Sequence, residues 1–105
     1  MRLLTFNVDA QHIRKDPNCD FTKIVAGSKG YLRAHFTLSP EWQDCVVVAS
    51  FWRGKEEHAA FVENGECMIP DEALVGPTFR VSLIGQRGYY RITTDKVLVR
   101  QEVSK

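Results

Sequence analysis

The chain has 105 residues, 44% hydrophobic and 26% charged, a size and composition that fit one compact domain over residues 1–105. Its 14 Lys and Arg residues nearly balance 13 Asp and Glu residues, and they are scattered along the chain, which excludes the basic footprint of a nucleic-acid-binding protein. No apolar run is long enough for a membrane span or a signal peptide, so we expect no membrane partner.

The N-terminal third begins with an alternation of apolar and polar residues that predicts a strand over residues 2–8, with one face on a core. A short extended piece over residues 12–15 follows. The turn cluster Asp16-Pro17-Asn18 then opens an irregular stretch, and we expect residues 16–29 to form a mobile loop.

The middle of the chain resumes the alternation over residues 30–38, the best half-buried strand in the sequence. A single helical turn is predicted at Ser39-Pro40-Glu41-Trp42, with Ser39 as its cap and Trp42 swung back over the core. The nearly unbroken apolar run over residues 45–53 predicts a central strand that is covered on both faces.

The C-terminal half contains the strongest turn signal, Asn64-Gly65, which predicts a type I′ hairpin between residues 57–63 and 66–69. A short helical turn is expected at residues 70–74. Further strands are predicted at 79–84, 89–93 and 96–102, with a turn at 86–88. Seven to nine short strands and no long helix indicate an all-β fold, an antiparallel sandwich of two sheets.

Histidines and cysteines are the first candidates for chemistry. His12, His35 and His58 lack any metal-ligand spacing and are interpreted as surface residues, so no metal or cofactor site is predicted. Cys45 and Cys67 fall in or beside strands and are interpreted as structural thiols. With Cys19 they make an odd number without CxxC spacing, which favours a reducing compartment such as the cytoplasm.

Two further patterns have plain interpretations. The stretch Gly27-Ser28-Lys29-Gly30 lacks the full spacing of a phosphate loop and is interpreted as a simple loop. Acidic residues cluster around the predicted hairpin without calcium-loop spacing, and they are interpreted as its solvated face. They are Glu56, Glu57, Glu63, Glu66, Asp71 and Glu72. No catalytic residue is predicted, and we expect the protein not to be an enzyme.

Three aromatic residues, Trp52, Tyr89 and Tyr90, are the candidates for contact with a ligand or partner. Alternation places Trp52 opposite in direction to Phe51, and Tyr89 opposite to Tyr90, so one of each pair leans outward or is covered. Aromatic residues on a sandwich stack on sugar rings or anchor a protein partner. Core and edge packing is the competing interpretation.

The order of several short elements resembles the immunoglobulin-like β-sandwich domains that are encoded among tail and baseplate genes of tailed bacteriophages and prophages. The most particular elements are Phe36-Thr37-Leu38-Ser39-Pro40-Glu41-Trp42 and Cys67-Met68-Ile69-Pro70-Asp71-Glu72, and the resemblance spans residues 24–101. It implies an immunoglobulin-like sandwich with one or two short helical turns, and a non-enzymatic structural or binding module of the virion, made in the bacterial host cytoplasm.

The implied partners are other phage tail or baseplate proteins, together with further copies of the chain because tail assemblies are symmetric. A carbohydrate-binding module that attaches the particle to a cell-wall glycan is the alternative, with Trp52, Tyr89 or Tyr90 as stacking platforms. A small enzyme or hydrolase accessory is the third hypothesis, which would need His35 or His58 to meet Cys45 or an acid in a cleft.

Overall fold

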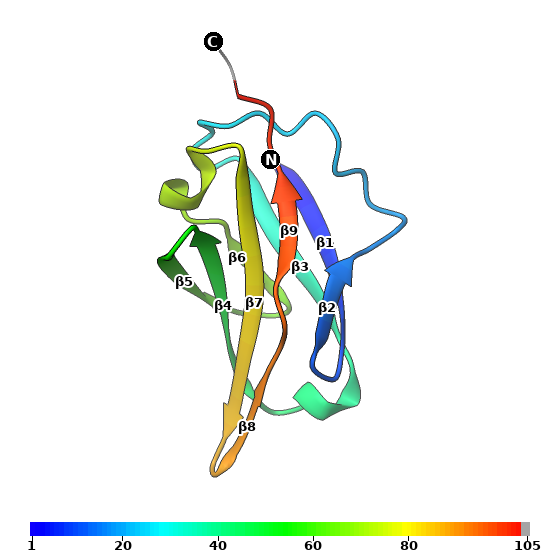
Figure 1. Ribbon diagram of the computed structural model, residues 1–105. Helices are drawn as coiled ribbons and strands as arrows, with labels where there is room; N and C mark the ends of the chain where they lie inside the picture. The colour runs from blue at the N-terminus through cyan, green and yellow to red at the C-terminus, as the bar shows by residue number, and fades with distance from the viewer. Residues whose placement is uncertain (104–105) are drawn as a thin grey trace.

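The computed structural model describes residues 1–103, which form two β-sheets packed face to face, with a 3₁₀ helix at either end (Figure 1). The first sheet has the order β2-β1-β3-β6, and the second has the order β5-β4-β7-β8 with β9 also beside β7. The elements are β1 (Arg2–Asp9), β2 (His12–Lys15), β3 (Leu32–Leu38), η1 (Pro40–Trp42), β4 (Val46–Arg53), β5 (Glu56–Val62), β6 (Glu66–Met68), η2 (Asp71–Leu74), β7 (Thr78–Arg87), β8 (Tyr90–Thr93) and β9 (Val97–Arg100). The predicted two-sheet sandwich is confirmed.

The core lies between the sheets and follows from the alternation of side chains along each strand. Phe6 of β1 stacks on Phe36 of β3, with ring centroids 5.5 Å apart. From the opposite sheet, Phe51 and Phe79 meet at 6.3 Å, and all four rings are buried. The predicted helical turn at η1 is also confirmed, because Trp42 is 2% exposed and closes one end of this core.

One strand pair departs from the expected antiparallel pattern. β1 and β3 run parallel, with Leu4 beside Ala34 and Phe6 beside Phe36. The intervening β2 turns back tightly at Asp9 and His12 to pair with β1 on its other side, so the chain must cross the end of the sandwich before β3 begins. Alternation specifies which face of the sheet a residue occupies but not which strand lies beside it. A strand shows the same alternation of apolar and polar residues whether its neighbour is parallel or antiparallel.

The Asn64-Gly65 turn has the predicted conformation but does not join a paired hairpin. Both residues have positive φ, 53° and 78°, as a type I′ turn requires. The two flanking strands meet at one bridge, Glu63 with Glu66, and then part, β5 to the second sheet and β6 to the first. The Phe36 N–H donates to the Gly65 carbonyl at 2.7 Å, which holds the turn against β3 and directs β6 into that sheet.

Three smaller predictions need correction. β4 is central, as predicted, but it is not covered on both faces, since Val46 is 63% exposed on the outer face of the second sheet. The Ser39 side chain does not cap η1, and its Oγ accepts the Ala10 N–H from the end of the neighbouring strand β1 at 2.8 Å. The turn predicted at residues 86–88 lies at residues 88–89, because β7 continues to Arg87.

Residues 16–29 cross one end of the sandwich as the long irregular segment before β3 (Figure 1). Arg2 donates to three of its backbone carbonyls, those of Asp20, Thr22 and Lys23, at 2.9, 2.6 and 3.1 Å. Ile24 is buried in the core cluster beside this contact. The loop is therefore tied to β1 along its second half.

Candidate contact surface

The β7–β8 hairpin carries two of the three candidate aromatic residues at its tip (Figure 1). Tyr89 lies in the two-residue turn and its side chain is fully exposed. The Tyr90 ring lies under the Arg87 guanidinium, 4.1 Å from Cζ to the ring centroid, and its hydroxyl donates to the Glu41 carbonyl at 2.8 Å. Arg87 also donates to the Gln43 carbonyl at 2.6 Å, so the tip is fixed to the η1 segment.

The third aromatic residue, Trp52, lies on the outer face of the second sheet. Its Nε1–H donates to Ser82 Oγ at 3.0 Å, which sets the plane of the ring against the sheet. The Lys96 ammonium stands 3.8 Å from the ring centroid, a cation–π contact that occupies one face of the indole. A sugar ring would have to displace this ammonium before it could stack on that face of Trp52.

The structure brings together Tyr89 and Tyr90 but not Trp52. Along β7, Trp52 pairs with Arg80 and Tyr90 pairs with Arg87. Seven residues of extended chain separate the two positions, a distance of about 23 Å. The aromatic candidates therefore belong to two different surfaces.

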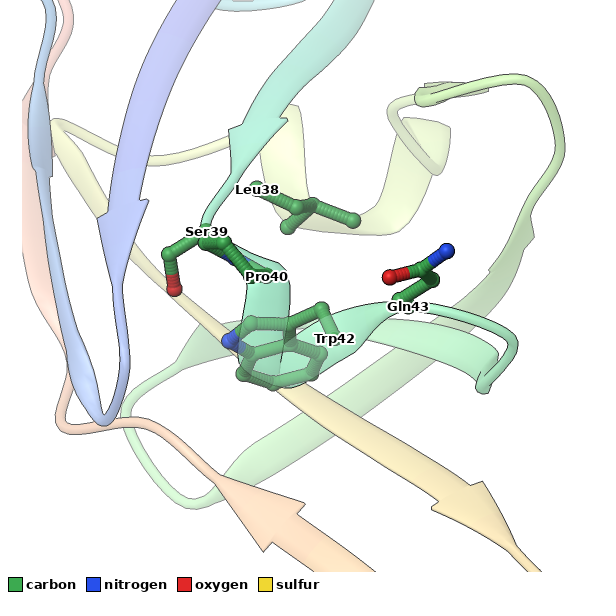
Figure 2. Close-up of a pocket in the computed structure, with 5 residues that line it drawn as sticks. All are labelled: Leu38, Ser39, Pro40, Trp42 and Gln43. Carbon is green, nitrogen blue, oxygen red and sulfur yellow. The ribbon is translucent and has the colours of Figure 1, made fainter.

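An apolar hollow of about 380 Å³ lies beside η1. Leu38, Ser39, Pro40, Trp42 and Gln43 line it, and Figure 2 shows these side chains around the opening. Sequence reasoning did not predict a hollow here. The predicted helical turn could have indicated it. A three-residue helix that buries its Trp leaves the flanking Leu and Pro at the edge of a depression in the surface. We call this hollow, with Tyr89 and Tyr90, the hairpin end.

The Trp42 indole N–H and the Ser39 hydroxyl, two polar groups of the hollow, are bonded within the fold, and the exposed Gln43 amide is the third polar side chain of the lining. Ala10 accepts the Trp42 Nε1–H at 2.9 Å through its carbonyl and donates its N–H to Ser39. Hydrogen bonds from the Ser39 side chain and from its own backbone N–H lower the pKa of Glu41 below its ordinary value, so this carboxylate is charged beside the opening. With Leu38, Pro40 and Trp42 in its lining, the hollow fits an apolar side chain, and the Gln43 amide at its edge can bond a polar group beside it.

The histidines lie apart from one another. His12 Nδ1 is 2.7 Å from Asp95 Oδ2, a contact between β2 and the segment before β9, and His58 Nε2 is 3.4 Å from Glu56 Oε1 on the same strand. His35 lies beside the Gly65 turn on β3. Across residues 1–103, no three His, Cys, Asp or Glu side chains are grouped closely enough to hold a metal ion.

All three cysteines are free thiols, and Cys67 is the buried one. Burial raises the pKa of the Cys67 thiol to about 12, against a smaller opposing effect of the nearby Arg33 charge. A thiol with this pKa is almost entirely protonated at neutral pH and is a poor nucleophile. Cys67 faces Ala34 across the β3–β6 pair, consistent with a packing role.

The glycine-containing loop and the acidic residues also have internal partners. The Gly27 N–H donates to the Leu74 carbonyl at 2.7 Å, so this amide points into the fold rather than toward an anion. Glu57 accepts the Ser50 hydroxyl at 2.5 Å on the outer face of the second sheet, and Glu66 accepts from Arg33 Nε at 3.3 Å. These acids lie on different sheets and do not converge.

Comparison with known proteins adds no family to these observations, since neither the models of protein families nor the curated proteins give a match. Within residues 1–103, none of the helices is long and apolar enough to cross a membrane.

Proposed function

We propose that this chain is a non-enzymatic structural or assembly module of a bacteriophage or prophage tail or baseplate, which acts in the virion through protein–protein contacts at the hairpin end. The observation that carries the contact is the exposed Tyr89 ring, held on a hairpin that Tyr90 and Arg87 fix to η1. A rigid aromatic residue loses little conformational entropy on binding, and such residues are common anchors of interfaces. The phage assignment is supported by the sequence resemblance of residues 24–101.

The apolar hollow supports the same role. It lies against η1, the segment to which Tyr90 and Arg87 are hydrogen-bonded. A projecting ring and an adjoining apolar hollow form a surface that an apolar side chain of a partner protein would fill, while Tyr89 packs on the partner. The charged Glu41 beside the opening would favour a partner with a basic rim.

The test is incorporation into particles of the phage that encodes the chain. Mass spectrometry of purified particles is expected to find the chain, and Tyr89→Ala is expected to lower its amount at least about fivefold, a loss of roughly 1 kcal/mol of contact energy. Tyr31→Ala is the matched control, because Tyr31 is also exposed but lies next to the residue 16–29 loop. Absence of the chain from particles at all stages of assembly would refute the proposal.

Attachment to a cell-wall glycan is the second candidate, and the exposed Tyr89 ring is the observation that favours it. Trp52 and Tyr90 are less suited, because Lys96 and Arg87 lie over their rings. Binding of the purified chain to cell-wall glycan, lost in Tyr89→Ala and kept in Trp52→Ala, would support this function. A glycan array without a hit would exclude it and leave the protein partner.

A further inference from the structure

The outer face of the second sheet carries a row of apolar side chains on three adjacent strands. Phe61 of β5, Val48 of β4 and Ile84 of β7 are paired in register and therefore lie side by side on the same face. Val46 continues the apolar surface two residues further along β4. We call these four residues the apolar row.

This row is open to solvent. Phe61 is 69% exposed and Val46 is 63% exposed, while Val48 and Ile84 are half-buried between them. Within residues 1–103, no strand or helix covers the outer face of this sheet. A single exposed apolar residue is ordinary on a protein surface, but a contiguous group in register on one flat face is typical of an interface.

Charge is divided across this face. On the β5 side, Glu57 points outward opposite Trp52, and Glu63 has the same outward parity where β5 continues into the turn. On the other side, Arg80 of β7, Arg91 of β8 and Lys96 before β9 are exposed. The apolar row therefore lies between an acidic side and a basic side.

We propose that the face binds a second copy of this chain, with the two outer sheets face to face and a two-fold axis that runs parallel to the strands between β4 and β7, and so passes between Val48 and Ile84 of the apolar row. This axis keeps the direction of the strands and reverses their order, so that β5 of one copy faces β8 of the other. It places the acidic β5 side of each copy over the basic β8 and β9 side of the other, and Glu63 of each copy over Arg91 of the other. The pairing is self-complementary, as a two-fold interface requires.

The charges select this axis over the alternative. A two-fold axis perpendicular to the strands, in the plane between the sheets, would place β5 of one copy over β5 of the other. Glu57 and Glu63 would then lie near the same acidic residues of the second copy, and the basic side would face itself. Like charges across an interface oppose association, so the sheet accepts a copy of itself in one orientation.

The size of the face sets the strength of association. Four strands spaced about 4.8 Å apart and six residues along β4 span about 14 Å by 20 Å, well below a standard stable interface. The dimer is therefore a weak one, with dissociation expected in the micromolar to millimolar range, and the measurement must cover these concentrations.

The first test is sedimentation velocity of the purified chain from about 1 μM to about 1 mM, a range chosen from the expected affinity. A reversible monomer–dimer equilibrium is expected. Phe61→Glu should weaken it at least tenfold, because it places two carboxylates in the apolar row. Leu3→Glu is the matched control, since Leu3 is 43% exposed on the outer face of the other sheet, and it should leave the dissociation constant unchanged.

The second test reads out the orientation. Glu63→Arg and Arg91→Glu should each weaken the dimer, because each creates a like-charge pair across the axis, and the double variant should restore it. Both residues are exposed, so circular dichroism should show unchanged folding for all three variants.

A chain that stays monomeric at every concentration, or a dimer that Phe61→Glu leaves intact, overturns the proposal. If the double variant weakens the dimer by the sum of the effects of Glu63→Arg and Arg91→Glu, the proposed orientation is wrong. The inference concerns a different surface from the hairpin end, so its failure leaves the proposed function standing, and the particle experiment leaves the dimer untouched.

Discussion

At the scale of single residues, Gly85 shows how closely β7 packs against η1. A Cβ on Gly85 would stand 2.7 Å from Trp42 Cε3 and 3.2 Å from Cys45 Cβ, and Trp42 is buried and hydrogen-bonded to Ala10. A side chain on residue 85 would push the indole away from this position and strain its hydrogen bond to Ala10, so the strand favours glycine here.

We expect Gly85→Ala to lower the free energy of unfolding by about 1–3 kcal/mol, the usual cost of overpacking a core. Urea denaturation followed by Trp fluorescence measures this change. Gly76→Ala is the control, because its added Cβ would meet Arg53 Cδ at an ordinary 3.6 Å, and its effect should stay within about 0.5 kcal/mol. A Gly85→Ala variant as stable as the parent would contradict the close contact.

Cys67 gives a second prediction at this scale. Its pKa of about 12, against an ordinary value of 9.0, lowers the thiolate fraction at pH 8 about a thousandfold. Iodoacetamide at pH 8 should therefore leave Cys67 unlabelled in the native protein and label it rapidly in urea, as read by peptide mass spectrometry. Rapid native labelling would show that the thiol is exposed. Because the pKa is raised, the stability that the protonated thiol contributes is present below about pH 9 and is lost as the pH rises toward 12.

Residue-scale expectations were reliable where they depended on alternation. Phe6 and Phe36 are buried as predicted, because side chains of a strand point to opposite faces regardless of its neighbours. The role of Gly85 was not predictable in this way, since it depends on Trp42, which is distant in sequence.

At the scale of elements, local turn chemistry was predictable and strand partnership was not. Asn64 and Gly65 adopt the left-handed conformation that the dipeptide favours. Whether β5 and β6 then pair depends on the competing strands β4 and β3, whose edges each accept one of them. The hollow beside η1 was missed although its lining residues all lie between Leu38 and Gln43, because it depends on how the buried Trp42 seats this short segment on the core.

The residue 16–29 loop supports a prediction at this scale. Arg2 binds the carbonyls of Asp20, Thr22 and Lys23, and no other side chain can supply so many donors from one planar group. Arg2→Ala should increase amide hydrogen exchange of residues 20–24 at least about tenfold while leaving the core strands protected, as measured by mass spectrometry.

Arg2→Lys is the informative comparison, because it keeps the charge and loses the planar group. An intermediate increase in exchange is expected for it. If the loop exchanged as rapidly in the parent protein as in Arg2→Ala, the guanidinium would have no role in holding it.

At the scale of the whole molecule, the two sheets are joined beyond their core by a polar contact at one edge. Asp95, just before β9, accepts the Ile13 N–H of β2 at 2.9 Å and lies 2.7 Å from His12 Nδ1. Partial desolvation acts to raise the pKa of Asp95, but the hydrogen bonds from Ile13 and His12 and the charge of His12 outweigh it, so the pKa lies below its ordinary value of 3.8.

A carboxylate with a lowered pKa stabilises the fold above the unfolded value and stops doing so as the pH falls through the folded value. Stability should therefore fall as the pH drops below about 4, and Asp95→Asn should flatten that dependence. Chemical denaturation at a series of pH values from about 6 to about 2.5 tests this, with an intermediate slope expected for His12→Ala. The same slope in Asp95→Asn and the parent would rule out this contact as its source.

The fold class was predictable from sequence because the sandwich depends on properties that each strand carries alone, its length, its alternation and its bounding turns. The parallel pairing of β1 with β3 was not, since it depends on where the chain crosses the end of the sandwich. Trp52 and Tyr89 were selected by residue type, and their separation on two surfaces required the strand register.

Both ends of the described chain are bound to one loop. Arg2 holds residues 20–23, and Glu102 exchanges backbone hydrogen bonds with Ile24 and Ala26. The β7–β8 tip lies at the opposite pole of a molecule whose longest dimension is 47 Å (Figure 1). A tether placed on either terminus would therefore hold the protein by one pole and point Tyr89 into the bulk liquid, so an immobilised chain would keep its aromatic tip available for capture.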